Sequence, residues 1–371
     1  MEIPQQFAAY FAQHHFHHLT PIQAQTYNPL MQGQSVLGLA PTGSGKTLAF
    51  GMPLITQVQP QQGLQKLILE PTQELAIQTR NVLRSLAPEL NIYGVIGGAN
   101  RQRQIEKLKT KPEIVVGTLG RVHDLVTQRK LKLAKLQTIV VDEADLMVSD
   151  KLPELRQLLQ RAPSGVQLVF FSATSTPQFQ KLSQLFHQQF VIVDQSQDSF
   201  SRQGLQHYFV LTDEKHKIQL LKQLAHRKSA RILVFCASGK ALHRLAATLR
   251  YQKLYFMVLD TSDPKLRREE AIRTFEQKQA SILLTTDVAA RGMDLPAITT
   301  VVNWQNPANL TQYIHRSGRT GRMGHDGEVV TLGNQHDWRQ LQHLLQASTI
   351  TARKVQLQNG KFSGPRTTRH P

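Results

Sequence analysis

The segment APTGSGKT, residues 40–47, has the residue types and spacing that hold the phosphates of a nucleotide. Its glycines let backbone N–H groups approach phosphate oxygens, Lys46 reaches the β and γ phosphates, and the Thr47 hydroxyl can ligate Mg²⁺. The generic pattern has a glycine where Ala40 stands. An apolar run precedes the segment and a helical pattern follows it, as a phosphate loop requires. The residues expected to bind the nucleotide here are Thr42, Gly43, Ser44, Gly45, Lys46 and Thr47.

A second set of chemical groups lies in TIVVDEADLM, residues 138–147. Asp142 follows an apolar run directly, and Glu143 and Asp145 come next. A carboxylate in this position can hold Mg²⁺ through water, while its neighbour polarises the water that attacks the γ-phosphate. Acidic residues are common at the start of loops, so this pair alone decides little. Together with the phosphate loop, it predicts nucleotide hydrolysis with Thr47 and Asp142 at the metal.

Buried parallel strands are expected to position both segments. In the first half, SVLGLA, KLILE, EIVVG, TIVVD and QLVFF are short apolar runs that end at glycine, proline or a polar residue. Helical patterns separate them, including residues 73–86 and 153–160. After a polar stretch the alternation resumes with HYFVL, RILVF, SILLT and TTVVN. Two α/β units with parallel sheets follow, and functional loops should leave the carboxyl ends of the strands.

The expected boundaries follow from these patterns and from the length of 371 residues, which exceeds the usual size of one core. We expect an N-terminal domain over residues 1–197, a linker over 198–206 and a C-terminal domain over 207–355. From residue 356 to 371 the periodicity is lost while basic residues persist, which favours a disordered basic tail.

Charge and composition restrict the partners. Forty-four basic against 26 acidic residues give a net charge of +18, so nucleic acid is the first partner to consider. No run of 18 apolar residues and no signal-like start are present, which favours a cytoplasmic protein without a membrane partner. The single cysteine, Cys236, lies in an apolar run and is expected to be a buried small hydrophobe. The histidine-rich HHFHH, residues 14–18, is too short to favour a closed metal site.

The combination of APTGSGKT and VDEAD resembles the DEAD-box RNA helicases, and the resemblance continues in order through nearly the whole chain. It implies two tandem RecA-like domains, ATP and Mg²⁺ as cofactors, and RNA as substrate. FHHLTPIQ, residues 16–23, resembles the adenine-reading motif, so Gln23 is expected to bond the adenine edge. SAT at residues 172–174 resembles the segment that couples hydrolysis to strand separation. Coupling is therefore expected of Asp145, Ser172, Thr174 and His315.

The resemblance also assigns the basic segment YIHRSGRTGR, residues 313–322. An arginine inserted beside the transferred phosphate is worth about 10³ to 10⁵ in rate for GTPases. Arg319 and Arg322 are implied to be such fingers, so they act only when the two domains close. His315 and Arg316 are expected to organise the loop and its contacts to the acidic loop of the first domain. A patch of three arginines that faces RNA is the alternative.

The RNA site is implied to form from both domains, which grip phosphates and sugars of one strand and so read no sequence. PTQELAIQ, GGANRQRQ and TLGR in the first half, and LVFCAS and TTDVAARGMD in the second, resemble the family's remaining motifs. Gly292 and Asp294 are implied to bind the nucleotide. The residues expected to contact RNA are Thr72, Gly98, Thr118, Arg121, Arg268 and Thr285.

Departures from the family pattern gather on the RNA side. Gln73 replaces the arginine of PTRELA, Leu119 replaces a proline, and DTSDPKLRR from Asp260 replaces a segment with a His-Gly pair. An aromatic that stacks on adenine is not found at its usual offset, so Phe7 or Tyr10 could substitute. We expect hydrolysis to be retained more firmly than efficient unwinding.

The prediction is an ATP-dependent RNA helicase that acts on structured RNA, with ribosomal particles or RNA-decay complexes as further partners. One rival is an ATP-gated RNA clamp that rarely turns over. The other is a DNA translocase of the same superfamily. RNA-stimulated phosphate release would separate the first rival from the helicase, and equal stimulation by DNA and RNA would favour the second.

Overall fold

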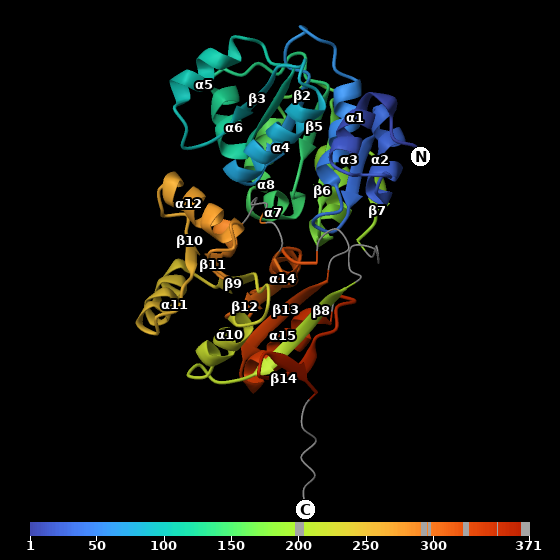
Figure 1. Cartoon of the computed structure of the whole chain (residues 1–371). Helices are drawn as coiled ribbons and strands as arrows, with labels where there is room; N and C mark the ends of the chain where they lie inside the picture. The colour runs from blue at the N-terminus through green and yellow to red at the C-terminus, as the bar shows by residue number, and fades with distance from the viewer. Residues whose placement is uncertain (197–203, 291–294, 296–297, 322–325, 347, 365–371) are drawn as a thin grey trace, which may run out of the picture. The chain divides into compact units, whose positions relative to one another are not determined.

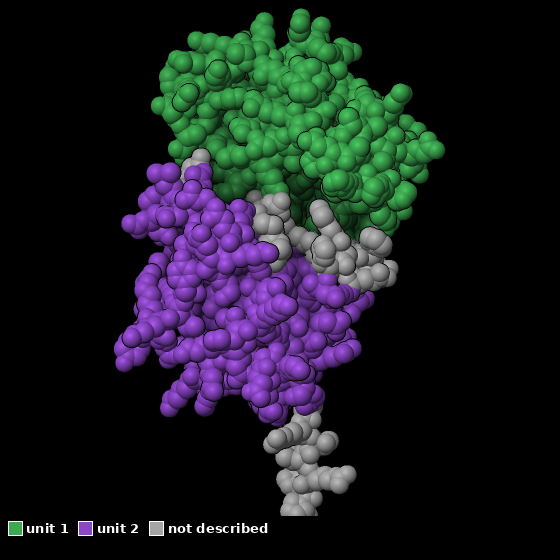
Figure 2. Space-filling model, in the orientation of Figure 1, with its two compact units in different colours: residues 1–198 green, residues 199–371 purple. Residues whose placement is uncertain are grey.

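The computed structural model describes residues 1–196, 204–290, 295, 298–321, 326–346 and 348–364. The chain divides into two compact units, Met1–Asp198 and Ser199–Pro371 (Figures 1 and 2). Each unit has its own sheet and its own cores. Among the described helices, none has the length and apolar character needed to cross a bilayer.

The sheet of the first unit has seven parallel strands in the order β3-β4-β2-β5-β6-β1-β7. Five of them match the expected strands, and β3 and β7 are additional. The strands are β1 (Ser35–Leu39), β2 (Lys66–Glu70), β3 (Ile92–Val95), β4 (Ile114–Thr118), β5 (Thr138–Val141), β6 (Gln167–Ser172) and β7 (Phe190–Asp194).

Helices cover both faces of this sheet (Figure 1). One face packs against helices from the beginning of the chain, namely α1 (Ala8–Gln13), α2 (Pro21–Met31), α3 (Lys46–Thr56) and α4 (Gln73–Leu86). The other packs against α5 (Arg101–Leu108), α6 (Leu119–Thr127), α7 (Ala144–Asp150), α8 (Leu152–Leu159) and α9 (Leu182–Phe186). Two short 3-10 helices, Gln5–Phe7 and Pro177–Lys181, complete the unit.

Strand alternation decides which side chains meet the phosphate-loop helix α3. Leu67 and Leu69 belong to the core on the α6 and α8 side, whereas Ile68 and Val140 belong to the core that contains α3. Because successive residues of a strand point to opposite faces, Glu70 and Asp142 follow Ile68 and Val140 onto the α3 side. The sheet thus delivers two acidic side chains to the helix that begins with Lys46.

The second unit contains an eight-stranded sheet in the order β10-β11-β9-β12-β13-β8-β14-β15, in which only the β14–β15 pair is antiparallel among the described pairings. The expected strands HYFVL, RILVF, SILLT and TTVVN are confirmed as β8, β9, β11 and β12, the last three of which begin one residue later than expected. The strands are β8 (Leu205–Leu211), β9 (Ile232–Cys236), β10 (Met257–Leu259), β11 (Ile282–Thr286), β12 (Thr300–Asn303), β13 (Gly327–Gly333), β14 (Arg353–Gln358) and β15 (Lys361–Ser363).

Helices of the second unit pack on both faces of its sheet. On one side α10 (Lys217–Ala225) and α11 (Gly239–Tyr251) share a core with β9 and β11. On the other lie α12 (Lys265–Glu276), α13 (Asp287–Ala290), α14 (Leu310–Ser317) and α15 (Gln335–Leu345). Two parallel-dominated sheets flanked by helices confirm the expected α/β fold class.

The expectation of a disordered tail from residue 356 is wrong for residues 356–363. They form the end of β14 and the whole of β15, and β14 also pairs with β8. Val355 and Leu357 are buried, and the Asn359–Gly360 turn has the positive φ angles that a tight hairpin needs. Phe362 then packs on Tyr208, with ring centroids 4.3 Å apart. Residues 365–371 lie outside the described part of the chain.

The linker expected over residues 198–206 is also too long at its end, because β8 already begins at Leu205. Most of that segment, residues 198–203, lies outside the described part of the chain. The first strand of the second unit is therefore two residues longer than its alternation of apolar residues indicated. Leu205 and Gln206 pair with Gly327 and Glu328 of β13.

Cys236, on β9, is confirmed as a buried residue of the second unit's core. Burial raises the pKa of its thiol to about 12, so the thiolate that reacts with electrophiles is scarce at neutral pH. The cysteine serves as a small apolar side chain in the packing of the sheet.

Lys66 is buried at the opposite end of β2 from Glu70, where its ammonium donates to Gln57 and to the Thr138 hydroxyl, each at 3.1 Å. Burial lowers its pKa from 10.5 to about 8. Between these two values the unfolded chain binds more protons than the folded one, so stability rises with pH. Below pH 8 the cost of the charged form is fully present, about 3 kcal/mol by the size of the shift.

We expect Lys66→Met to remove this rise in stability between pH 8 and 10.5. Urea unfolding followed by circular dichroism at both ends of that range measures the effect. Both tryptophans, Trp304 and Trp338, lie in the second unit, so their fluorescence reports separately on a part of the chain that the substitution should not affect. Equal pH dependence of the two proteins would contradict the prediction.

Candidate active site

The predicted functional segments of the first unit leave one edge of its sheet, at the carboxyl ends of the strands. Across the sheet from β3 to β1, these segments are GGAN, TLGR, PTQEL, DEAD, SAT and the phosphate loop. This order in space differs from their order along the chain, because β1 and β2 lie inside the sheet. Segments expected to contact RNA thus occupy the β3-β4-β2 side, and segments expected to act on the nucleotide occupy the β5-β6-β1 side.

The phosphate loop connects β1 to α3 and contains two glycines with positive φ, Gly43 at 80° and Gly45 at 88°. The Lys46 ammonium donates to the carbonyls of Ala40 and Pro41, at 3.0 and 3.2 Å, and lies 4.0 Å from Glu143 Oε1. These contacts fold the lysine back over its own loop. They also bring the cation next to the carboxylate that was predicted to activate water.

Gln23 connects the start of α2 to the phosphate loop. Its side-chain oxygen accepts from Thr20 N at 2.9 Å, which caps α2, and its amide nitrogen donates to the Gly45 carbonyl at 3.2 Å. A Cβ on Gly45 would lie 2.3 Å from that nitrogen and would displace the Gln23 amide, and the φ of 88° also favours glycine here. Gln23 therefore joins the start of α2 to the phosphate loop, and its contact with adenine stays a prediction.

The proposed substitutes for the adenine-stacking aromatic differ in exposure. Phe7 is 2% exposed and belongs to the core around α2 and α3, so it is not available to stack on a base, and that suggestion is wrong. Tyr10 is partly buried and stacks on His14, with ring centroids 4.0 Å apart. His14 belongs to the HHFHH segment, where its ring nitrogen also contacts the Tyr10 carbonyl.

The acidic loop after β5 is tightly constrained. Glu143 adopts a left-handed conformation with φ of 45°, which is uncommon for a residue with a side chain and typical of functional positions. Asp142 is 4% exposed and accepts a hydrogen bond from Glu143 N at 2.9 Å. Burial, and then the charge of Glu143, raise the pKa of Asp142 to about 7. A nearby cation would stabilise its ionised form.

Sequence reasoning missed Glu70, a further acid of this site. It is fully buried at the end of β2, and burial together with the charge of Asp142 raises its pKa well above the ordinary value. The signal was a charged residue closing the otherwise apolar run KLILE. Its neighbours include the charges of Asp142, Glu143 and Lys46.

The donor atoms of this region fit Mg²⁺. The ion prefers oxygen ligands, keeps several of its waters and is usually held by one or two carboxylates. Thr47 supplies a hydroxyl from the first turn of α3, Asp142 supplies a buried carboxylate, and the Glu70 oxygen Oε2 has no hydrogen-bond partner among the described residues. A bound divalent cation would stabilise the ionised form of these buried carboxylates and so lower their raised pKa values.

The predicted coupling residues of the first unit are in contact. The Thr174 hydroxyl donates to Asp145 Oδ2, and Asp145 is 1% exposed. Ser172 fixes Thr174 in turn, because its hydroxyl donates to the Thr174 carbonyl at 2.7 Å and accepts from Thr174 N at 3.2 Å. The end of β6 is therefore bonded to the first turn of α7. This bond joins the acidic loop directly to SAT, and the coupling role of these residues stays a prediction.

The segments expected to contact RNA also meet in the first unit. Thr72 caps α4 by accepting from Leu75 N at 3.2 Å. Thr118 is the last residue of β4, directly before α6, and its hydroxyl accepts from Gly97 N at 3.4 Å. Gly98 has a φ of 69°, and a Cβ there would touch the amide of Gln73.

The residue that replaces the family's arginine, Gln73, therefore packs against the glycine turn rather than standing alone. Arg121 donates to the Ala99 carbonyl at 3.2 Å and to Gln104 at 3.1 Å. Together these contacts join the ends of β2, β3 and β4 into one surface.

In the second unit, Arg316 is 1% exposed and has a structural role. Its guanidinium makes two hydrogen bonds to the Asp287 carboxylate, each 2.7 Å, and donates to Asn303 and to the Gln305 carbonyl. It also lies over the Phe235 ring. These bonds all lie within the second unit, where they hold α14 to Asp287 and to the end of β12, and the contact expected with the acidic loop stays a prediction. Burial of Arg316 also contradicts the alternative of a three-arginine patch.

Two other residues of the segment 313–322 are more exposed than Arg316. His315 is on α14, and Arg319 follows it after Gly318, where both are partly exposed. Arg322, Gly292 and Asp294 lie outside the described residues, so their roles stay predictions. Arg268 is partly exposed near the start of α12.

Thr285 does not fit the expected RNA contact. Its side chain is fully buried, and its hydroxyl lies within hydrogen-bond distance of the carbonyls of Leu259 and Thr286. We correct its assignment to a residue that joins β11 to β10 and the start of α13. The hydroxyl of the next residue, Thr286, accepts from the N–H of Ala289, a residue of the short helix α13 that begins at Asp287.

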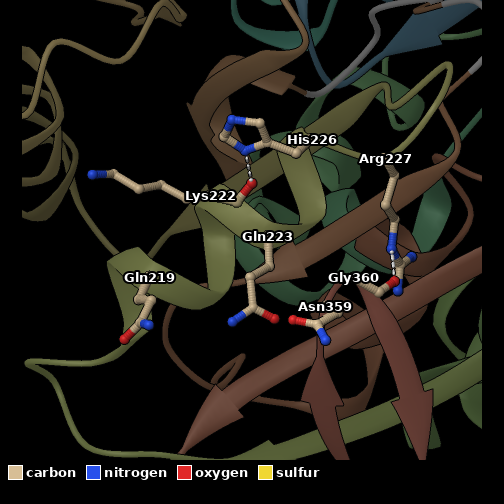
Figure 3. Close-up of a pocket in the computed structure, with 7 residues that line it drawn as sticks. All are labelled: Gln219, Lys222, Gln223, His226, Arg227, Asn359 and Gly360. Atoms are coloured by element: carbon tan, nitrogen blue, oxygen red, sulfur yellow. Dashed lines mark hydrogen bonds between the residues drawn. The ribbon is translucent and has the colours of Figure 1, made fainter.

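A surface pocket of the second unit lies away from all of these residues. It is formed by α10 and by the turn of the β14–β15 hairpin (Figure 3). Arg227 donates to the Gly360 carbonyl there, and its guanidinium also pairs with Glu328. The lining residues are Gln219, Lys222, Gln223, His226, Arg227, Asn359 and Gly360. No predicted site residue lines it.

The fold and the first unit's site define a helicase core built of two RecA-like units. The DEAD/DEAH box helicase family matches residues 20–182, and the helicase conserved C-terminal domain matches residues 216–324. The chain belongs to the family of DEAD-box ATP-dependent RNA helicases.

Individual relatives support this membership. DEAD-box ATP-dependent RNA helicase CshC of Bacillus cereus is 33% identical over 353 residues, which cover 94% of this chain and 90% of the relative. Probable ATP-dependent RNA helicase YfmL of Bacillus subtilis is 35% identical over 320 residues, or 84% of each chain. Among solved structures, S. cerevisiae Dbp5 bound to RNA and ADP BeF3 superposes with a TM-score of 0.83 at 24% identity, covering 95% of this chain and 94% of that one.

Proposed function

We propose that this chain hydrolyses ATP under stimulation by RNA and uses domain closure to separate or remodel short RNA duplexes. The observation that carries the proposal is the position of Lys46 Nζ, 4.0 Å from Glu143 Oε1, at the same sheet edge as the bond between Asp145 and Thr174. A phosphate-binding cation, a water-activating carboxylate and a connection to SAT are thereby adjacent.

In this mechanism Lys46 binds the β and γ phosphates against the phosphate loop, and Gln23 orients the adenine. Thr47 and Asp142 would hold Mg²⁺, partly through water. When bound, the ion neutralises charge that develops on the phosphate oxygens. Glu143 accepts a hydrogen bond from the attacking water and polarises it. Its left-handed backbone keeps the carboxylate beside Lys46 before substrate arrives.

The second unit completes the site on closure. Arg319 and Arg322 add positive charge beside the transferred phosphate, while Gly292, Asp294 and His315 contact the nucleotide or the acidic loop. Arg316 does not enter the site, because it supports α14 through Asp287. The Asp145–Thr174 bond then transmits the state of the acidic loop to the RNA surface.

RNA would lie along the surface of Thr72, Gly98, Thr118, Arg121 and Arg268, which contact its backbone without reading bases. The net charge of +18 favours a polyanionic partner. Ribosomal particles or RNA-decay complexes are the proposed settings, in the cytoplasm.

Phosphate release with single-stranded RNA, with DNA of the same sequence and without nucleic acid tests this function. We expect RNA alone to stimulate the rate and a short RNA duplex to separate in the presence of ATP. RNA binding without RNA-stimulated release would favour the clamp. Equal stimulation by DNA would favour a translocase. Absence of any ATP turnover would overturn the proposal.

For Glu143→Gln we expect ATP and RNA to bind while phosphate release falls by about 10² to 10⁴, the usual contribution of a general base. The amide has the same shape but polarises water poorly. Quenched-flow measurement of a single turnover locates the loss in the chemical step. Brisk release by the variant would remove Glu143 from this role.

A further inference from the structure

The carboxylate of Glu70 occupies an unusual position. Glu70 is the last residue of β2 and is 0% exposed. Its Oε1 accepts a hydrogen bond from the Thr79 hydroxyl of α4 at 2.6 Å. Its Oε2 is buried and has no hydrogen-bond partner among the described residues. A buried carboxylate oxygen without a partner costs free energy, so its presence calls for a ligand that the protein itself does not supply.

The fold directs this oxygen toward the nucleotide site. β2 pairs with β5 in a register that sets Leu69 opposite Val141, so Glu70 and Asp142 follow side by side. Both lie on the face that packs against α3, as the alternation of Ile68 and Val140 requires. The charges of Asp142, Glu143 and Lys46 act on Glu70, which places it among the groups proposed to act on ATP.

A hydrated divalent cation is the ligand that suits an acidic oxygen in this place. Mg²⁺ gives up its waters reluctantly, and those waters donate hydrogen bonds to nearby carboxylates. Groups that hold such waters commonly change metal affinity by 10- to 100-fold when they are removed. The Thr79 bond fixes one Glu70 oxygen and leaves the other to accept from a water.

We propose that Glu70 is a positioning residue for the metal, whose Oε2 accepts a hydrogen bond from a water bound to Mg²⁺ at Thr47 and Asp142. The inference rests on the proposed ATP-hydrolysing function and adds a carboxylate that lies outside the motifs of the family resemblance. Glu70 immediately precedes Pro71 and Thr72, so the same strand end that holds the metal water also carries a residue of the proposed RNA surface.

The test uses the full chain and a fluorescent ADP carrying a methylanthraniloyl group, titrated with MgCl₂. For Glu70→Gln we expect the Mg²⁺ concentration at half-maximal nucleotide binding to rise about 10-fold. Affinity measured in EDTA should stay within about twofold, because the amide removes the carboxylate and keeps the acceptor for Thr79. Should this variant be insoluble, Glu70→Ala carries the same expectation for the Mg²⁺ midpoint, because it also removes the carboxylate.

Two variants separate the metal role from a structural one. Glu113 is a buried carboxylate near the opposite edge of the same sheet, where it accepts from Gln61 N and Asn91 N. Glu113→Gln should leave the Mg²⁺ midpoint unchanged. Thr79→Val removes the hydroxyl that anchors Glu70 and retains the carboxylate, so its midpoint should move less than that of Glu70→Gln. A Tm measurement monitors folding of each.

An unchanged Mg²⁺ midpoint in folded Glu70→Gln, beside a metal-dependent wild type, would overturn the inference and leave the proposed function intact. A shift of equal size in EDTA would also overturn it, since the effect would then concern the nucleotide and not the metal. Failure of the wild type to bind the fluorescent ADP at any Mg²⁺ concentration would instead defeat the proposed function.

Discussion

Replacing Lys46 with alanine is expected to reduce ATP turnover to the background rate. Lys46 is 7% exposed, and its ammonium lies over the phosphate loop, 4.0 Å from Glu143 Oε1. Its removal takes away the cation that meets the β and γ phosphates and leaves the buried carboxylates without their adjacent positive charge. Phosphate release at saturating ATP and RNA measures the loss, and nucleotide binding should fall with it.

Lys66 provides a matched control, because it is a second buried lysine of the same unit. It lies at the amino end of β2, whereas the nucleotide site lies at the carboxyl ends of the strands. Lys66→Met should retain RNA-stimulated turnover, although it should remove the rise in stability between pH 8 and 10.5. Activity in the Lys46 variant close to that of wild type would mean that the loop at residues 40–47 does not bind the phosphates. Loss of activity in both variants would point to a general disturbance of the sheet.

Arg319→Ala is expected to slow the chemical step by about 10³ to 10⁵, the effect of an arginine finger in related phosphoryl transfer. RNA affinity of the nucleotide-free protein should change little, because the arginine is proposed to meet the phosphate only after closure. Single-turnover hydrolysis and RNA titration, measured on the same preparation, separate the two quantities. Equal losses in both would favour an RNA-facing role.

Arg316, three residues earlier, distinguishes a finger from a structural arginine. Its two bonds to Asp287 are buried, and removal of one partner from such a pair typically costs about 3 to 5 kcal/mol. Arg316→Ala should therefore lower the urea midpoint that Trp304 and Trp338 report for the second unit. Arg319→Ala should leave that midpoint near the wild-type value.

Local patterns predicted much of the fold and of the nucleotide site. APTGSGKT and VDEAD encode their chemistry in adjacent residues, and their strands are continuous apolar runs, so no knowledge of distant contacts was needed. The hairpin of β14 and β15 was also visible in principle, as alternating Val355, Leu357 and Phe362 around Asn-Gly. Its polar residues outweighed that signal.

Other features depend on contacts between segments far apart in the chain. The pairing of Arg316 with Asp287 and the burial of Thr285 follow from the order of strands in the second sheet. Glu70 becomes informative only once β2 is placed beside β5, because a single acid at the end of an apolar run has many ordinary explanations. Such relations arise from topology, which single-sequence patterns specify poorly.

The crowding of motif segments at the carboxyl ends of the first unit's strands leaves the opposite rim free for protein engineering. Residues 59–62 are exposed in the connection that enters β2, and Gly165, before β6, has open space around its α-carbon. A dye or affinity tag inserted at either connection would sit a full strand length away from the chemistry. Labelled protein could then be followed during catalysis with its working surfaces unaltered.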